Sequence, residues 1–64
     1  MIGYVAKDED GKVYLYTEKP TFNIDYEAWF SNGDMFNITE TFPEFNDMSY
    51  TDEPVKVEIN IKRL

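Results

Sequence analysis

The sequence has no cysteine and no histidine among its 64 residues. Without cysteine the chain forms neither a disulfide nor a thiolate metal site, which is compatible with a reducing compartment. Without histidine it lacks the usual general base at neutral pH and the commonest metal ligand. Ser31 and Ser49 are the only serines, and neither has such a base to activate it. No nucleophile–base pair can be assembled from the usual residues.

Carboxylates are the remaining route to catalysis, because 13 Asp and Glu residues are present. A glycosidase needs two of them beside a sugar-sized cleft, and 64 residues are too few to wall such a cleft and also bury a core. The segment DEDG at 8–11 resembles the start of a calcium loop, but Lys12, Val13 and Lys19 occupy positions where an EF-hand has ligands or glycine. We therefore expect no enzyme, no metal and no cofactor.

Long apolar runs are also missing. No run approaches the roughly 20 residues that span a membrane, and the N-terminal MIGYVAKDEDG lacks the pattern of a signal peptide. A chain of this length forms one domain at most. We expect residues 1–64 to be a complete, single, cytoplasmic domain with no membrane partner.

Positive charge is absent from the middle of the chain. Residues 20–55 contain eight acids and no base, a charge of −8, while the net charge of the chain is −7. An imbalance this local gives the folded domain a negative field on some face. Two interpretations stay open, namely simple solubility and attraction of a basic partner. The candidate partner-binding acids are Asp25, Glu27, Asp34, Glu40, Glu44, Asp47, Asp52 and Glu53.

Two short segments near the N-terminus predict a β-hairpin. IGYVAK (2–7) and KVYLYT (12–17) are rich in β-branched and aromatic residues. The DEDG segment between them suits a type I turn that ends in a left-handed residue. If Asp8 lies opposite Lys12, alternate side chains point to opposite faces. One face then carries Val5, Val13 and Leu15, and the other carries Tyr4, Tyr14 and Tyr16.

A second hairpin is predicted in the middle of the chain. YEAWF (26–30) and MFNI (35–38) flank SNGD, and Asn-Gly is the preferred centre of a type I′ hairpin turn. This register places Trp29 opposite Phe36, with Trp29 as a core anchor. Residues 21–25 before this hairpin are interpreted as a loop.

The last third predicts one helical turn and one strand. TFPE at 41–44 has the Ser/Thr-x-x-Glu form of a capping box, which indicates a helical turn near 42–46. VKVEINIK at 55–62 alternates strictly between β-branched and polar residues, as a half-buried strand does. The predicted fold is therefore mainly β. We expect about five antiparallel strands, from two hairpins and a C-terminal strand, in a curled sheet or partly open barrel.

The aromatic residues have two interpretations. Tyr4, Tyr14 and Tyr16 resemble a stacking platform for single-stranded nucleic acid. However, acids outnumber bases by 13 to 6, and phosphate contacts supply most of the affinity of such platforms. We expect no direct nucleic-acid binding. The tyrosines either pack a second side of the sheet or form a protein-binding face. Phe42 and Phe45 either cap an open end of the sheet or contact a partner.

Three segments, AKDEDGKVYLYTEKP, FPEF and EPVKVEINIKR, together resemble a group of short, uncharacterised acidic proteins of bacteriophages and mobile elements. The resemblance spans most of the chain. It implies a bacterial host and a non-enzymatic protein that binds and blocks a host complex, as anti-CRISPR proteins do. The expected partner is a host protein with a basic nucleic-acid-binding surface, such as a defence nuclease.

Two modes of recognition are considered. Asp25 and Glu27 are separated by one residue, and on a strand they would stand about 6–7 Å apart, close to the spacing of successive phosphates, so they would partly mimic a nucleic acid. The other hypothesis is an accessory subunit that forms a homodimer through edge strands. Residues 55–61 or the hairpin 4–16 would provide that edge.

Overall fold

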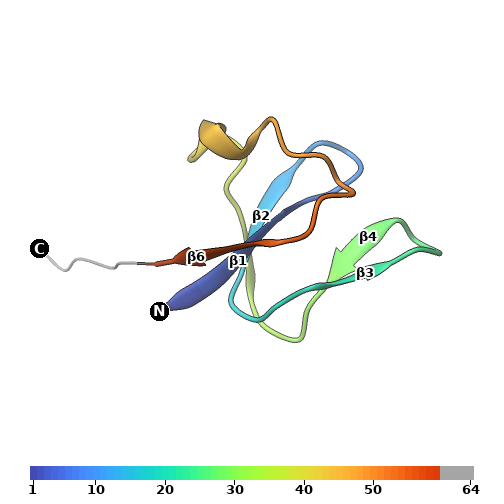
Figure 1. The fold of residues 1–64 in the computed structure, drawn as a ribbon, viewed down its shortest axis with the longest axis horizontal. Helices are drawn as coiled ribbons and strands as arrows, with labels where there is room; N and C mark the ends of the chain where they lie inside the picture. Colours follow the sequence, from blue (N-terminus) through green and yellow to red (C-terminus); the bar gives the residue numbers. More distant parts are fainter. Residues whose placement is uncertain (60–64) are drawn as a thin grey trace, which may run out of the picture.

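The computed structural model describes residues 1–59 and is mainly β, as the sequence predicts (Figure 1). Its strands form two antiparallel sheets, one with the order β5-β2-β1-β6 and one made of β3 and β4. Within the described residues neither sheet closes into a barrel. The elements are β1 (Ile2–Lys7), β2 (Val13–Tyr16), β3 (Thr21–Asn23), β4 (Ala28–Phe30), β5 (Met35–Asn37), the 3₁₀ turn η1 (Pro43–Phe45) and β6 (Val55–Glu58).

The first predicted hairpin is confirmed in its register. Val5 lies opposite Leu15, and the backbone N–H of Asp8 donates to the carbonyl oxygen of Lys12 at 2.9 Å. The N–H of Gly11 donates to the Asp8 carbonyl at 3.0 Å, and Gly11 has φ 90°. This is the expected type I turn followed by a left-handed residue. β1 and β2 become the two central strands of the larger sheet, so this hairpin is not the free edge considered for self-association.

The second predicted hairpin is wrong. Its two strands belong to different sheets, since β4 pairs with β3 and β5 pairs with β2. Trp29 therefore lies opposite Phe22, and Phe36 lies opposite Leu15. The segment interpreted as a loop, 21–25, contains strand β3, so residues 1–59 contain six strands where about five were expected.

The SNGD segment at 31–34 connects the two sheets and does not form a type I′ turn. Neither Asn32 nor Gly33 has the positive φ that such a turn requires. The segment is instead held against the end of β2, where the N–H of Thr17 donates to the Asp34 carbonyl at 3.0 Å and the N–H of Asp34 donates to Thr17 Oγ1 at 2.9 Å. A Cβ at Gly33 would collide with Thr17 Oγ1. Glycine is needed at this position for close approach between chain segments.

Both faces of the four-stranded sheet are packed. Val5, Val13 and Ile38 form the core on one face, with Leu15, Phe45, Met48 and Val57 packed against them. On the other face Ala6 and Tyr16 are 0% and 1% exposed. In Figure 1 the β3–β4 sheet and η1 lie on different sides of the β1–β2 hairpin. The predicted division of β1 and β2 into two side-chain faces is therefore correct, and both faces are covered in part.

The helical turn is present, but the capping box is not. Phe42 rather than Thr41 is the N-cap residue of η1, and no side chain caps it. The C-terminal strand pairs with β1 as an edge strand through Glu58, and the rest of the predicted strand 55–62 beyond Ile59 lies outside the described residues. No helix within residues 1–59 has the length and apolar character needed to cross a bilayer.

Candidate interaction surface

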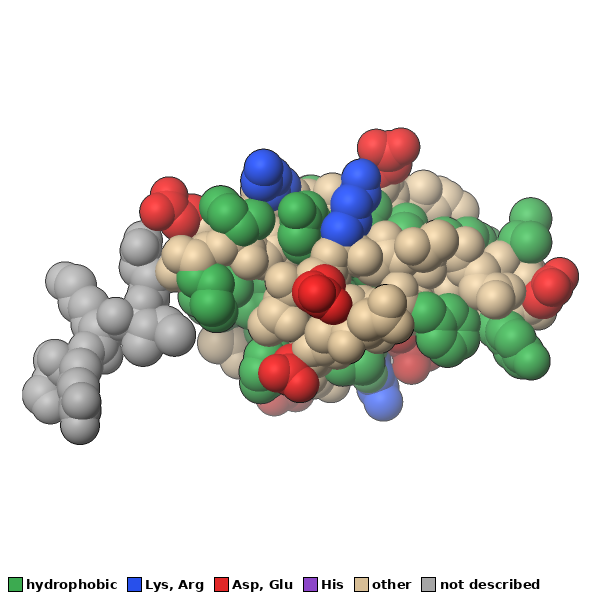
Figure 2. Space-filling model, turned by 90° about the horizontal axis from the view of Figure 1, so that it is seen from below, with side chains coloured by type: hydrophobic (Ala, Val, Ile, Leu, Met, Phe, Trp, Pro, Cys, Tyr) green, Lys and Arg blue, Asp and Glu red, His purple; other side chains and the backbone are tan. Residues whose placement is uncertain are grey.

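The eight candidate acids are all exposed, but they do not form one continuous face. They come from four regions of the chain, and some of these regions lie on different sides of the sheet (Figure 1). Figure 2 shows Asp and Glu side chains at several separate places, with hydrophobic side chains between them. Asp25 and Glu27 lie in the β3–β4 loop, and Asp34 precedes β5. Glu44 lies in η1 with Glu40 before it and Asp47 after it, and Asp52 and Glu53 precede β6.

The β3–β4 loop combines charge with exposed apolar surface. Its four residues, Ile24, Asp25, Tyr26 and Glu27, alternate between apolar and acidic side chains. Ile24 is 79% exposed and Tyr26 is 74% exposed, the two largest values among the large hydrophobic residues of 1–59. In Figure 1 this hairpin extends away from the larger sheet. Such side chains contribute nothing to the core and remain free for a partner.

The conformation of this loop is fixed by local interactions. Asn23 Oδ1 accepts hydrogen bonds from the N–H groups of Asp25 at 2.9 Å and Tyr26 at 3.3 Å, which is an Asx turn. The rings of Tyr26 and Phe30 pack edge to face with centroids 6.1 Å apart, although Phe30 is itself 53% exposed. A loop ordered in this way loses less conformational entropy when it binds.

A second loop lies next to this one. The pKa of Glu9, in the β1–β2 loop, is raised above its usual value, because its carboxyl group hydrogen-bonds to the side chain of Glu27, which also repels its charge. Burial and the charge of Asp10 contribute less. Glu9 precedes the segment 20–55 that holds the eight candidate acids, so only the fold brings these two carboxylates together. We call Glu9, Ile24, Asp25, Tyr26, Glu27 and Phe30 the hairpin-tip surface.

Tyr16 was expected to contact a partner, but it is a core residue with an exposure of 1%. Burial, followed by the charge of Asp8 and then Tyr14, raises the pKa of Tyr16 to about 12. The pKa of Asp8 is also raised by burial, with a smaller opposing effect of the backbone N–H of Trp29 and a contribution from Asp10. Among the described residues, Asp8 Oδ1 and Tyr16 Oη have no hydrogen-bond partner. These interactions lie where β1 meets β4 and concern packing.

The other predicted aromatic residues have mixed positions. Tyr14 is half-buried beside Tyr16, with ring centroids 6.4 Å apart. Phe45 packs against the core as a cap, whereas Phe42 remains 44% exposed. Trp29 is an anchor of the smaller sheet and not of the main core, since its Nε1 donates to the Tyr50 carbonyl at 3.2 Å and its ring packs edge to face on Phe22.

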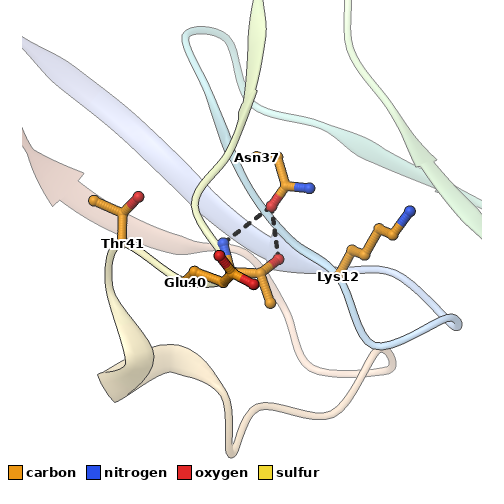
Figure 3. A pocket seen from close by; sticks show the side chains of 5 residues that line it. Lys12, Asn37, Glu40 and Thr41 are labelled. Atoms are coloured by element: carbon orange, nitrogen blue, oxygen red, sulfur yellow. Dashed lines mark hydrogen bonds between the residues drawn. The ribbon is translucent and has the colours of Figure 1, made fainter.

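A polar hollow of about 410 Å³ lies beside the β2–β5 pair (Figure 3). Its polar groups already have structural roles, since Asn37 Oδ1 accepts from the N–H of Thr39 at 3.0 Å and from Thr39 Oγ1 at 2.7 Å. Thr39 Oγ1 in turn accepts from the N–H of Val13 at 2.8 Å. Lys12 extends away from the Glu40 carboxylate in this view. In residues 1–59 no group of three or more acidic side chains is placed to hold a metal ion.

Comparison with known proteins gives no relative for this chain. No protein-family model matches the sequence, and no curated protein or solved structure matches it significantly. The hairpin-tip surface therefore has to be interpreted from its own geometry and charge.

Proposed function

We propose that this protein is a non-enzymatic binding protein that inhibits or modulates a host complex through the hairpin-tip surface. The observation that supports this proposal is the alternation of exposed apolar and acidic side chains at the end of the β3–β4 hairpin. Interface hot spots are enriched in aromatic residues. Tyr26 and Phe30 are therefore the proposed anchors, in place of the buried Tyr16.

The proposed partner is a host protein with a basic, nucleic-acid-binding surface, a defence nuclease being the leading class. The described bases are Lys7, Lys12, Lys19 and Lys56, none of which belongs to the β3–β4 hairpin. The carboxylates of the tip would accelerate association with a positive surface. The rings of Tyr26 and Phe30 would become buried in the complex and would slow its dissociation.

Mimicry of a nucleic acid takes a more local form in this proposal. Asp25 and Glu27 lie in a turn, where Glu27 has φ 51°, so the spacing of side chains on a regular strand does not apply to them. The other six candidate acids of residues 20–55 lie elsewhere on the fold. The tip would occupy one phosphate-binding position of the partner, and its apolar residues would supply contacts that a nucleic acid backbone lacks.

The test uses purified RNA-guided nucleases as probes and a matched pair of charge variants. Asp25→Asn/Glu27→Gln removes two charges from the tip, and Asp52→Asn/Glu53→Gln removes two exposed charges elsewhere. For a nuclease that binds, we expect the affinity to fall at least about tenfold between 50 and 300 mM salt, because exposed charges are screened. The tip variant should lose that salt dependence and the control should keep it, as measured by biolayer interferometry and inhibition of DNA cleavage. Salt-insensitive binding, or equal losses in the two variants, contradicts the proposal.

Self-association is the second candidate, and the position of β6 favours it. The N–H of Ile59 donates to the Met1 carbonyl at 2.6 Å, and Gly3 lies opposite Val57 in the same ladder. Because bonding alternates along an antiparallel pair, the backbone groups of Lys56 and Glu58 point away from β1. Lys56→Pro would remove an outward N–H without disrupting the ladder to β1. A dimer seen by light scattering and lost in this variant supports the hypothesis, and a monomer contradicts it.

A further inference from the structure

The outer edge of β6 carries backbone groups that no other strand of residues 1–59 uses. β6 lies at the end of the strand order β5-β2-β1-β6 and pairs with β1. The N–H of Ile59 donates to the Met1 carbonyl at 2.6 Å, so the odd-numbered residues of 55–59 bond to β1. Because bonding alternates along an antiparallel pair, the N–H and C=O groups of Lys56 and Glu58 point to the outer edge. An edge of this kind is a template for pairing with another chain.

The side chains of this strand divide into a charged face and an apolar face. Lys56 and Glu58 lie on the same face as Tyr4, because successive side chains point to opposite faces. Both charged side chains are exposed. The other face carries three β-branched residues, Val55, Val57 and Ile59. Val55 is 40% exposed although it belongs to this apolar row.

Charge selects one register for the pairing of two such edges. When two edges bond antiparallel, outward residues must lie opposite outward residues, and two-fold axes at Lys56, Val57 and Glu58 satisfy this rule. An axis at Lys56 places two lysines opposite each other and puts Pro54, which has no N–H, opposite Glu58. An axis at Glu58 places two glutamates opposite each other. Only the axis at Val57 places each lysine opposite a glutamate, and unlike charges stabilise a cross-strand pair whereas like charges destabilise it.

We propose that two copies of this chain pair through β6 around a two-fold axis at Val57 and join their four-stranded sheets into one continuous sheet. Lys56 of each copy pairs with Glu58 of the other, so the same contact forms twice, as two-fold symmetry requires. On the opposite face, Val57 packs against its own copy and Val55 packs against Ile59. The inference rests on self-association, the second candidate function, and adds its register and symmetry. A strand of four residues gives a small interface, so the dimer should be weak.

Charge reversal tests this register, because the symmetry applies each change twice. Lys56→Glu places acids opposite each other, and Glu58→Lys places bases opposite each other. We expect each single variant to associate at least about tenfold more weakly than the wild type. An equimolar mixture of the two variants should form a heterodimer, and Lys56→Glu/Glu58→Lys should regain the homodimer. Sedimentation velocity of the full chain measures association, and native mass spectrometry identifies the heterodimer.

Two control variants change the net charge by the same amounts outside β6. Lys12→Glu matches Lys56→Glu, and Asp25→Lys matches Glu58→Lys, and all four positions are exposed. The controls should associate as the wild type does. A dispersed ¹H–¹⁵N spectrum verifies that each variant is folded, and the spectrum of the wild type should show concentration-dependent shifts at Lys56 and Glu58.

The outcomes separate this register from self-association in general. A wild-type dimer that both single reversals leave intact would overturn the register while self-association through β6 stands. A wild type that stays monomeric at millimolar concentration would overturn both. Oligomers that keep growing with concentration would show that β6 pairs with β5 of the next copy, which contradicts two-fold symmetry. A mixture of the two single variants that stays monomeric would also overturn the proposal.

Discussion

The β1–β2 and β3–β4 hairpins both contain a left-handed residue in their loops, but the residue differs. Gly11 has φ 90° in the first loop, and Glu27 has φ 51° in the second. The first loop contains three acids, Gly11 and Lys12 between its strands, whereas the second exposes Ile24 and Tyr26. The β1–β2 pair lies at the centre of the main sheet, and β3–β4 forms a separate two-stranded sheet.

The two left-handed residues, Gly11 and Glu27, differ in what they contribute to stability. A left-handed backbone costs a residue with a Cβ about 1–2 kcal/mol, and glycine avoids that cost. Gly11 is therefore the residue that stability favours, and Glu27 is not. A strained glutamate beside a 74% exposed tyrosine has no role in the core, and this agrees with the binding role proposed for the tip.

The largest expected effect is a difference in lost stability between two truncations, one in each hairpin. Val13 is fully buried, so Val13→Ala should lower the free energy of unfolding by about 2 kcal/mol through lost burial and a cavity. Phe30→Ala should cost no more than about 0.5 kcal/mol, because the ring is 53% exposed. Both free energies are measured by urea unfolding, with Trp29 fluorescence as the signal. Similar losses in the two variants would show that β3–β4 belongs to the stabilising core.

Two substitutions at the left-handed positions, one that removes a glycine and one that introduces a glycine, should change the stability by smaller amounts and in opposite directions. Gly11→Ala should destabilise the chain by about 1 kcal/mol from backbone strain alone, since a Cβ at Gly11 meets no atom within 4 Å. Glu27→Gly should stabilise it by about 1 kcal/mol because strain is released. Thermal unfolding should show shifts of about 4–8 °C down and up. A destabilised Glu27→Gly would mean that the glutamate side chain supports the fold.

The smallest expected effect concerns the contact between the two loops. The folded protein raises the pKa of Glu9 above its usual 4.5, so the native state keeps this proton to a higher pH than the unfolded chain. Stability should therefore decrease as the pH rises through that raised value.

Glu9→Gln removes this titration, and Glu53→Gln is a matched control at an exposed acid outside the hairpin-tip surface. We expect the melting temperature of Glu9→Gln to change less between pH 4 and 7 than those of the wild type and the control. Parallel profiles for all three proteins would show that the two loops do not interact in solution.

Part of this surface can be predicted from the sequence. The absence of bases between residues 20 and 55 indicates exposed carboxylates, and all eight are exposed. Their distribution over the molecule could not be predicted, because it depends on how the strands assemble. The contact of Glu9 with Glu27 joins residues 18 positions apart in sequence, and no local pattern connects them. Tyr16 is buried and Tyr26 is exposed, and this difference also depends on how the strands assemble.

The sequence by itself determined the β class, the register of the first hairpin and the helical turn after residue 42, because side-chain alternation and turn conformation act between residues close in the chain. Only the tertiary structure decided the partners of β4 and β5. Local sequence does not separate the two pairings, because these short apolar segments can form a ladder with each other or with other strands. The choice depends on long-range interactions, such as the hydrogen bonds between Thr17 and Asp34 and the tight approach at Gly33.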